Sequence, residues 1–114
     1  MTIDYWDAAE ALDEKLGDAP NAAAAKTAAA ALEDARRASL MTLRATTKAD
    51  AYLGVGEAKV AAKTAAIAAL EAYEDAENAD TDAAWTAAEH AADCERLANA
   101  NLETARSHAE RYWK

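Results

Sequence analysis

His90 and Cys94 are the residues whose types and spacing come nearest to a chemical site. They stand four positions apart, with Glu89 and Asp93 beside them. Positions four apart share a face of a helix, so an imidazole and a thiolate at this spacing can begin a zinc site. The other half is missing, because His108 is the only further His and lies about 21 Å from Cys94 along a straight helix. We therefore expect no metal and no cofactor.

Catalytic arrangements of other kinds are also missing from the sequence. A carboxylate-bridged di-metal bundle needs Glu-x-x-His pairs, but Ala87 and Ala105 stand three positions before the two His residues. With 3 Gly in the chain, there is little material for a phosphate-binding loop. Cys94 would need a neighbouring base and a concave site to act as a nucleophile, and it is more typical of a core thiol. The sequence predicts a protein that is not an enzyme.

Alanine dominates the composition and predicts the fold class. Apolar residues make up 53% of the 114 residues, most of them Ala, which has the highest helix propensity. The helix breakers Gly and Pro occur only at Gly17, Pro20, Gly54 and Gly56. We expect a single all-α domain, either an antiparallel helical hairpin or a three-helix bundle with a short N-terminal helix. Ala buries little area, so the core is thin and self-association stays open.

The breakers and capping residues divide the chain into four predicted helices, over about 4–16, 20–53, 57–79 and 82–113. Gly17 ends the first helix, and Asp18 with Pro20 suits the start of the second. Gly54 and Gly56 flank one residue, which favours a tight reversal there. The cap-forming run 78–82 favours a new helix over one continuous rod across 57–113.

Two of these helices carry apolar stripes. In the third, Val60, Ile67, Leu70 and Tyr73 recur at spacings of seven, three and three beside smaller Ala positions. The last helix has the most regular stripe, which advances by threes and fours. Its members are Ala84, Ala88, Ala91, Cys94, Ala98, Leu102, Ala105, Ala109 and Tyr112.

Acidic residues gather around the predicted junction of the last two helices. From Glu71 to Glu95 the chain has acids and no Lys or Arg, and the whole chain has a net charge of −9. An acidic face either mimics a nucleic-acid phosphate track or docks on a basic partner, and a merely solvated helix surface is the alternative. The acids that we assign to partner binding are Glu71, Glu74, Asp75, Glu77, Asp80 and Asp82.

Basic residues bracket the two glycines and are candidates for contact with a partner or a nucleic acid. Tyr52 is the only aromatic side chain nearby to stack a base, and phosphate contacts alone give salt-sensitive binding. We expect these residues instead to pair with acids of neighbouring helices, and we expect no direct nucleic-acid binding. They are Arg36, Arg37, Arg44, Lys48, Lys59 and Lys63.

Aromatic residues lie at the ends of the predicted helices, at Tyr5, Trp6, Trp85, Tyr112 and Trp113. Aromatic side chains are typical anchors of interfaces. Two interpretations stay open: the first helix packs against the last, or these side chains contact a partner or a second copy.

Cysteine usage and hydropathy point to the cytoplasm. A chain with 1 Cys forms no internal disulfide, no apolar run of about 18 residues exists, and the N-terminus lacks the pattern of a secretory signal. We expect a cytoplasmic protein without contact to a membrane.

The second half of the chain carries a resemblance. It has Lys48-Ala49-Asp50-Ala51-Tyr52-Leu53, the glycine pair, Lys59-Val60-Ala61-Ala62-Lys63, an Ala-rich stretch and Leu102-Glu103-Thr104-Ala105-Arg106-Ser107. Over about 48–112 it resembles small Ala-rich helical accessory proteins of actinobacterial phages. Proteins of that kind are often encoded near single-strand annealing recombinases and are taken to be recombination or replication accessories. The resemblance implies a bacterial host and brings no catalytic residues.

The leading hypothesis is a non-enzymatic phage-type accessory protein that binds a host or phage DNA-processing protein through charged helical faces. One alternative is an acidic inhibitor of host defence, or of another nucleic-acid-binding protein, that acts by DNA mimicry. A second is a direct single-strand binder, and a third is a homo-oligomeric structural protein.

Overall fold

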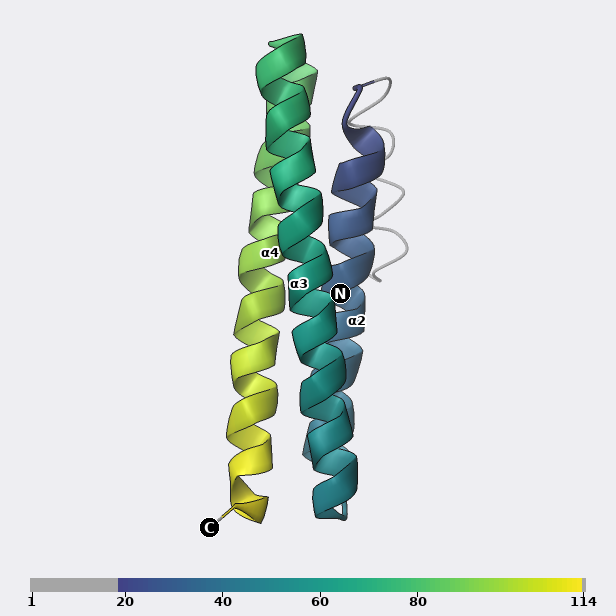
Figure 1. The fold of residues 1–114 in the computed structure, drawn as a ribbon, viewed down its shortest axis with the longest axis vertical. Helices are drawn as coiled ribbons and strands as arrows, with labels where there is room; N and C mark the ends of the chain where they lie inside the picture. Colours follow the sequence, from purple (N-terminus) through teal and green to yellow (C-terminus); the bar gives the residue numbers. More distant parts are fainter. Residues whose placement is uncertain (1–18, 114) are drawn as a thin grey trace, which may run out of the picture.

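Three long helices form the part of the chain that the computed structural model describes, residues 19–113 (Figure 1). They are α2 (Ala22–Arg44), α3 (Lys48–Ala79) and α4 (Asp82–Ala109), and a 3-10 turn, Glu110–Tyr112, follows α4. Each helix packs against the other two, and α3 runs antiparallel to both. The prediction of an all-α three-helix bundle is confirmed. The short helix predicted over 4–16 lies outside the described residues.

The first hairpin lies nine residues earlier than predicted, and the predicted break at Gly54 and Gly56 is wrong. α2 ends at Arg44, and α3 begins at Lys48 and continues through both glycines. Thr47 starts α3, because its Oγ1 accepts a hydrogen bond of 3.1 Å from the Asp50 N–H. Each glycine in a helix costs about 1 kcal/mol relative to Ala, which a packed helix of 32 residues tolerates.

The second junction lies where the capping residues predict it. Asp80 ends α3 in the left-handed conformation, at φ 49°, and its N–H donates to the Ala76 carbonyl. Thr81 then starts α4, since its Oγ1 accepts from the Ala84 N–H at 3.1 Å. Residues 57–113 are therefore divided between two antiparallel helices.

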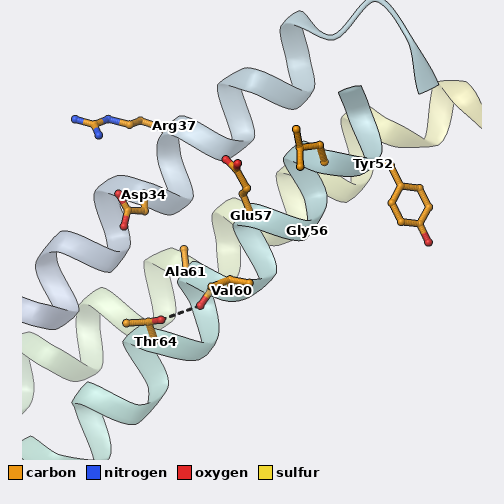
Figure 2. Close-up of a pocket in the computed structure, with 9 residues that line it drawn as sticks. Asp34, Arg37, Tyr52, Gly56, Glu57, Val60, Ala61 and Thr64 are labelled. Carbon is orange, nitrogen blue, oxygen red and sulfur yellow. Dashed lines mark hydrogen bonds between the residues drawn. The ribbon is translucent and has the colours of Figure 1, made fainter. Parts of the chain in front are cut away.

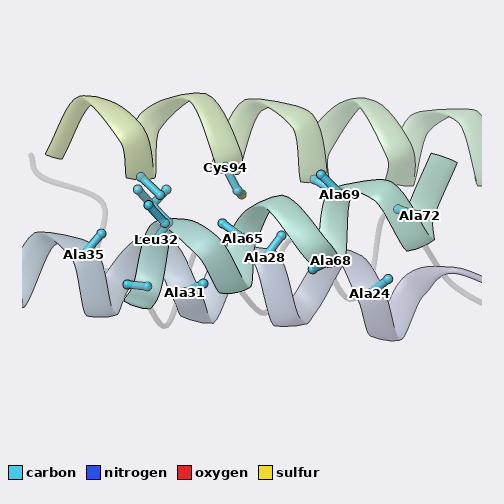
Figure 3. Close-up of a cluster of buried hydrophobic side chains, with 14 of the residues drawn as sticks. Ala24, Ala28, Ala31, Leu32, Ala35, Ala65, Ala68, Ala69, Ala72 and Cys94 are labelled. Carbon is cyan, nitrogen blue, oxygen red and sulfur yellow. The ribbon is translucent and has the colours of Figure 1, made fainter. Parts of the chain in front are cut away.

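Alanine fills the interior of the bundle. The buried apolar side chains larger than Ala are Leu32, Leu102 and Cys94 among the described residues. Figure 3 shows Leu32 and Cys94 surrounded by Ala side chains from α2 and α3. Small side chains let the helix axes approach closely, as at Gly54, where an added Cβ would overlap the Thr42 side chain.

The apolar stripes of α3 and α4 have opposite outcomes. The members of the α4 stripe from Ala84 to Ala109 are all buried. Val60, Ile67, Leu70 and Tyr73 of α3 are exposed instead. The opposite face of α3, made of Ala and Gly54, packs against α2 and α4, because only small side chains fit between helices at this separation.

Candidate protein-interaction surface

Cys94 lies on the buried face of α4, and His90, four positions earlier, is half-buried. Cys94 is buried, and its burial, with a smaller contribution from Asp93, raises the pKa of the thiol above its ordinary value of 9.0, while Arg36 opposes this rise. The thiol is therefore protonated at neutral pH and is a poor nucleophile or metal ligand. Within residues 19–113 no three His, Cys, Asp or Glu side chains converge on a point that suits a metal ion.

The outer face of α3 is the most unusual surface of the molecule. Val60 and Leu70 keep 66% and 61% of their surface exposed, although aliphatic residues of this size normally fill a core. Leu53 and Ile67 are also more than half exposed. The described part of the bundle thus buries mainly Ala and presents most of its larger apolar residues to solvent.

These exposed residues follow a regular spacing along one line of α3. Starting at Leu53, the line advances by three and four residues in turn, which is the a and d spacing of a coiled coil. We call it the α3 seam, and it consists of Leu53, Gly56, Val60, Lys63, Ile67 and Leu70. Gly56 leaves a gap in the α3 seam, because it has no side chain and nothing lies within 4 Å of the position where its Cβ would be.

Hollows flank the α3 seam on both sides. Between α2 and α3 lies an open groove of about 740 Å³, in which α2 supplies Asp34 and Arg37 and α3 supplies the rest (Figure 2). Between α3 and α4 a smaller hollow of about 250 Å³ borders Leu70 and Tyr73. The groove is lined by Asp34, Arg37, Tyr52, Leu53, Gly56, Glu57, Val60, Ala61 and Thr64.

The predicted acidic residues surround one end of the bundle, which we call the acidic end. Glu71, Glu74 and Glu77 are exposed, and Asp75 is half-buried, all within the last three turns of α3. No basic residue is present in the last turn. Glu77 lies in the last turn, where the negative end of the α3 dipole disfavours an acid, and the N-termini of α2 and α4 lie at the same end of the bundle.

The remaining two acids have structural roles. The Asp80 carboxylate accepts a hydrogen bond of 3.1 Å from the Trp85 indole N–H. Asp82 lies in the first turn of α4, where a negative charge is favourable.

The predicted basic residues do not form one patch. Arg37 lines the α2–α3 groove, whereas Arg36 acts on Cys94 of α4, and Lys48 lies 5.6 Å above the Trp113 ring at the far end. The expectation of pairing between helices is wrong for Arg37, whose partner at 2.9 Å is Glu33 of its own helix. Arg44, Lys59 and Lys63 are exposed. These basic residues are thus dispersed over the described part of the bundle.

The predicted interface aromatics are engaged at the two ends of the bundle. Trp85 packs edge-on against Tyr73 at 5.9 Å between ring centroids. Trp113 lies 5.6 Å from Tyr52, and the Tyr112 hydroxyl donates a 2.6 Å hydrogen bond to the Ala45 carbonyl. These three residues thus have contacts within the chain. Tyr5 and Trp6 lie outside the described residues.

Sequence reasoning missed two polar side chains that tie the helices together. Asn21 is buried at the start of α2, and its amide donates to the Ala72 carbonyl of α3 at 2.9 Å and the Ala84 carbonyl of α4 at 2.8 Å. Arg111 donates to the last carbonyls of α2 from the end of the chain. The position of Asn21 before a helix signals only a cap, so neither link has a local signal.

The chain matches no protein-family model, no curated protein and no solved structure among those searched. In the described part of the chain, no helix combines the length and the apolar character needed to span a membrane. The fold and its surface together define an all-α three-helix bundle with an outward-facing apolar seam and one acidic end.

Proposed function

We propose that this protein is a non-enzymatic interaction protein that contacts other protein chains through the outer surface of α3. The observation that carries this proposal is the α3 seam, in which large aliphatic side chains point outward at coiled-coil spacing. Contiguous exposed apolar surface on a small protein is typical of an interaction site. Covering such a side chain contributes about 1.5–3 kcal/mol, which a partner helix gains on binding.

We further propose that one partner is a DNA-processing protein, as in a phage-type accessory factor that works in the cytoplasm of a bacterial host. The acidic end supports this part of the proposal, because it gathers Glu74, Asp75 and Glu77 and has no basic residue in the last turn of α3. Proteins that handle DNA present basic surfaces, which complement such an end and are steered toward it.

DNA mimicry is the second candidate function, and the same acids favour it. An inhibitor of this kind would occupy the nucleic-acid channel of its partner with the acidic end. The two candidates differ in one measurement. A mimic displaces DNA from the partner in proportion to its own binding, whereas an accessory factor binds while DNA stays bound.

The test uses the full chain as bait in extracts of the bacterium that carries it, with and without phage infection, and then the purified partner in a binding titration. We expect neutralisation by Glu74→Gln, Asp75→Asn and Glu77→Gln to weaken binding by at least about tenfold and to reduce its salt dependence. Leu40→Glu on α2 is the control, since Leu40 is 47% exposed and lies outside the α3 seam.

A seam variant, Val60→Glu with Ile67→Glu, completes the test. Partner binding that none of these variants changes while circular dichroism shows intact helices would overturn the proposal. Loss of binding together with displacement of DNA by the unmodified chain would favour mimicry over the accessory role.

A further inference from the structure

The α3 seam is complementary to the same seam of a second copy that runs in the opposite direction. In a two-fold antiparallel contact whose axis passes between Val60 and Lys63, each residue of the seam faces another residue of the seam on the opposite chain. Leu53 then faces Leu70, Gly56 faces Ile67, and Val60 faces Lys63 of the opposite chain. In a coiled coil, antiparallel layers of this type join an a position to a d position, as each of these pairs does.

We propose that the α3 seam is the interface of a two-fold symmetric, antiparallel dimer of this chain, an inference that rests on the proposed role of α3 as the contact surface. The contact runs for about 25 Å from Leu53 to Leu70, at 1.5 Å per residue. The second copy covers the most exposed aliphatic side chains of the molecule.

Residue size supports the pairing of unlike positions. Gly56 has open space where its Cβ would be, so the longer Ile67 side chain of the second copy fits above it as a knob over a hole. In each outer layer of the contact, Leu53 of one copy meets Leu70 of the other. A parallel pairing would set Gly56 against Gly56 and leave a gap in the second of the six layers.

Charge along the bundle selects the antiparallel direction. The acidic end holds Glu71, Glu74 and Glu77. At the opposite end, which we call the basic end, Arg44, Lys48 and Arg111 outnumber Asp50 and Glu110. An antiparallel contact places the acidic end of each copy beside the basic end of the other, with Glu74 one position from Lys48. A parallel contact would place the two acidic ends together, and like charges side by side are unfavourable.

Lys63 is the one charged member of the α3 seam, and it lies next to the two-fold axis. Its aliphatic stem covers Val60 of the second copy while the ammonium group extends to the rim. A single polar residue at a core position of a coiled coil is a known determinant of register and partner number, at some loss of stability. The dimer therefore gains affinity when this charge is removed.

The thin core gives a physical reason for dimerisation. A single chain buries few apolar groups larger than Ala, and stabilisation by burial scales with area at about 25 cal/mol per Å². The seam holds the aliphatic area that the interior lacks. The acidic ends lie at opposite tips of the dimer.

Sedimentation equilibrium of the full chain over a wide concentration range tests the dimer. We expect a mass of twice 12.0 kDa that falls toward 12.0 kDa on dilution. The seam variant Val60→Glu with Ile67→Glu should raise the dissociation constant by about 100-fold or more, and Leu40→Glu should leave it unchanged. Lys63→Leu should lower it by about tenfold, which tests the interface without any risk of unfolding the chain.

Cross-linking tests the direction, in a background where Cys94→Ala removes the native thiol. Chains with Leu53→Cys should form disulfides with chains that carry Leu70→Cys, because these positions face each other across the interface. Disulfides that form instead within a pool of Leu53→Cys chains would show a parallel contact and overturn the register.

Three further results would overturn the proposal. They are a monomer at every concentration, a dimer that the seam variant does not change, and a defined assembly larger than two chains. A monomer that still captures a DNA-processing protein would refute the dimer and leave the proposed function standing. A dimer that captures no such partner would support the proposed interface and refute the proposed function.

Discussion

Gly54 and Gly56 stand two positions apart in one helix and have opposite surroundings. Gly54 is buried where α3 crosses α2, and a Cβ there would overlap Thr42 Oγ1 and lie 3.1 Å from Thr42 Cβ. Gly56 faces open space in a single chain. Only the first glycine is thus required by helix packing within the chain.

This difference predicts opposite effects of the same substitution. Gly54→Ala should destabilise the bundle by about 1–3 kcal/mol, because the added methyl group forces α2 and α3 apart. Gly56→Ala should stabilise a single chain by about 0.5–1 kcal/mol through helix propensity. Urea unfolding of both variants, followed by circular dichroism at one protein concentration, measures the two changes.

Thr42 supplies the control for this pair. Thr42→Ala removes the hydroxyl that donates to Ala38, and it should reduce the cost of Gly54→Ala in the double variant. Equal effects of Ala at both glycines would contradict the close approach of α2 and α3.

At the scale of the elements, the C-terminal end of α2 is capped by a side chain that is distant in the sequence. Arg111, just after α4, donates hydrogen bonds to the carbonyls of Thr42 at 3.0 Å, Leu43 at 3.0 Å and Ala45 at 2.9 Å. Its guanidinium also lies 4.9 Å from the Tyr112 ring. The last carbonyls of α2 lack partners within the helix, and a cation is favourable there.

Arg111→Ala should therefore destabilise the bundle by about 1–2 kcal/mol and fray the end of α2. In hydrogen-exchange measurements, the amide protons in the last turn of α2 should exchange faster in this variant than in the unmodified chain, while those in the middle of α2 change less. Arg106→Ala is the matched control, since Arg106 pairs with Glu103 on the surface of one helix and should contribute less than about 0.5 kcal/mol. A loss no larger for Arg111 than for Arg106 would contradict the cap.

Sequence patterns predict the elements where local signals are strong. Thr81 and its neighbours mark the start of α4, and the α4 stripe is the only regular apolar line on that helix. In α3 two lines compete, one of large residues and one of Ala with Gly54. Ranking by hydrophobicity selects Val60, Ile67 and Leu70, but the helix separation set by Ala on the other helices decides the outcome.

The candidate surface was predictable only in part for the same reason. The acids from Glu71 to Asp82 stand together in the sequence and stay together at one end of the bundle. The basic residues are neighbours in sequence, yet Arg36 and Arg37 diverge because successive helical positions are about 100° apart. The α3 seam becomes a surface only when tertiary packing turns it outward.

At the scale of the whole molecule, charge is separated along the long axis, which extends 50 Å. The acids of the acidic end repel one another in a chain with a net charge of −9, and Glu77 in the last turn also opposes the α3 dipole.

Neutralising that end by Glu74→Gln, Asp75→Asn and Glu77→Gln should consequently raise stability while it weakens partner binding. We expect a gain of about 1 kcal/mol in the free energy of unfolding at low salt. The gain should shrink near 1 M salt, where the screening length falls to about 3 Å. Urea titrations of the unmodified chain and the triple variant, at equal protein concentration and at two salt levels, measure this gain. A loss of stability would show that these acids support the fold, and the surface argument for the acidic end would then lose its basis.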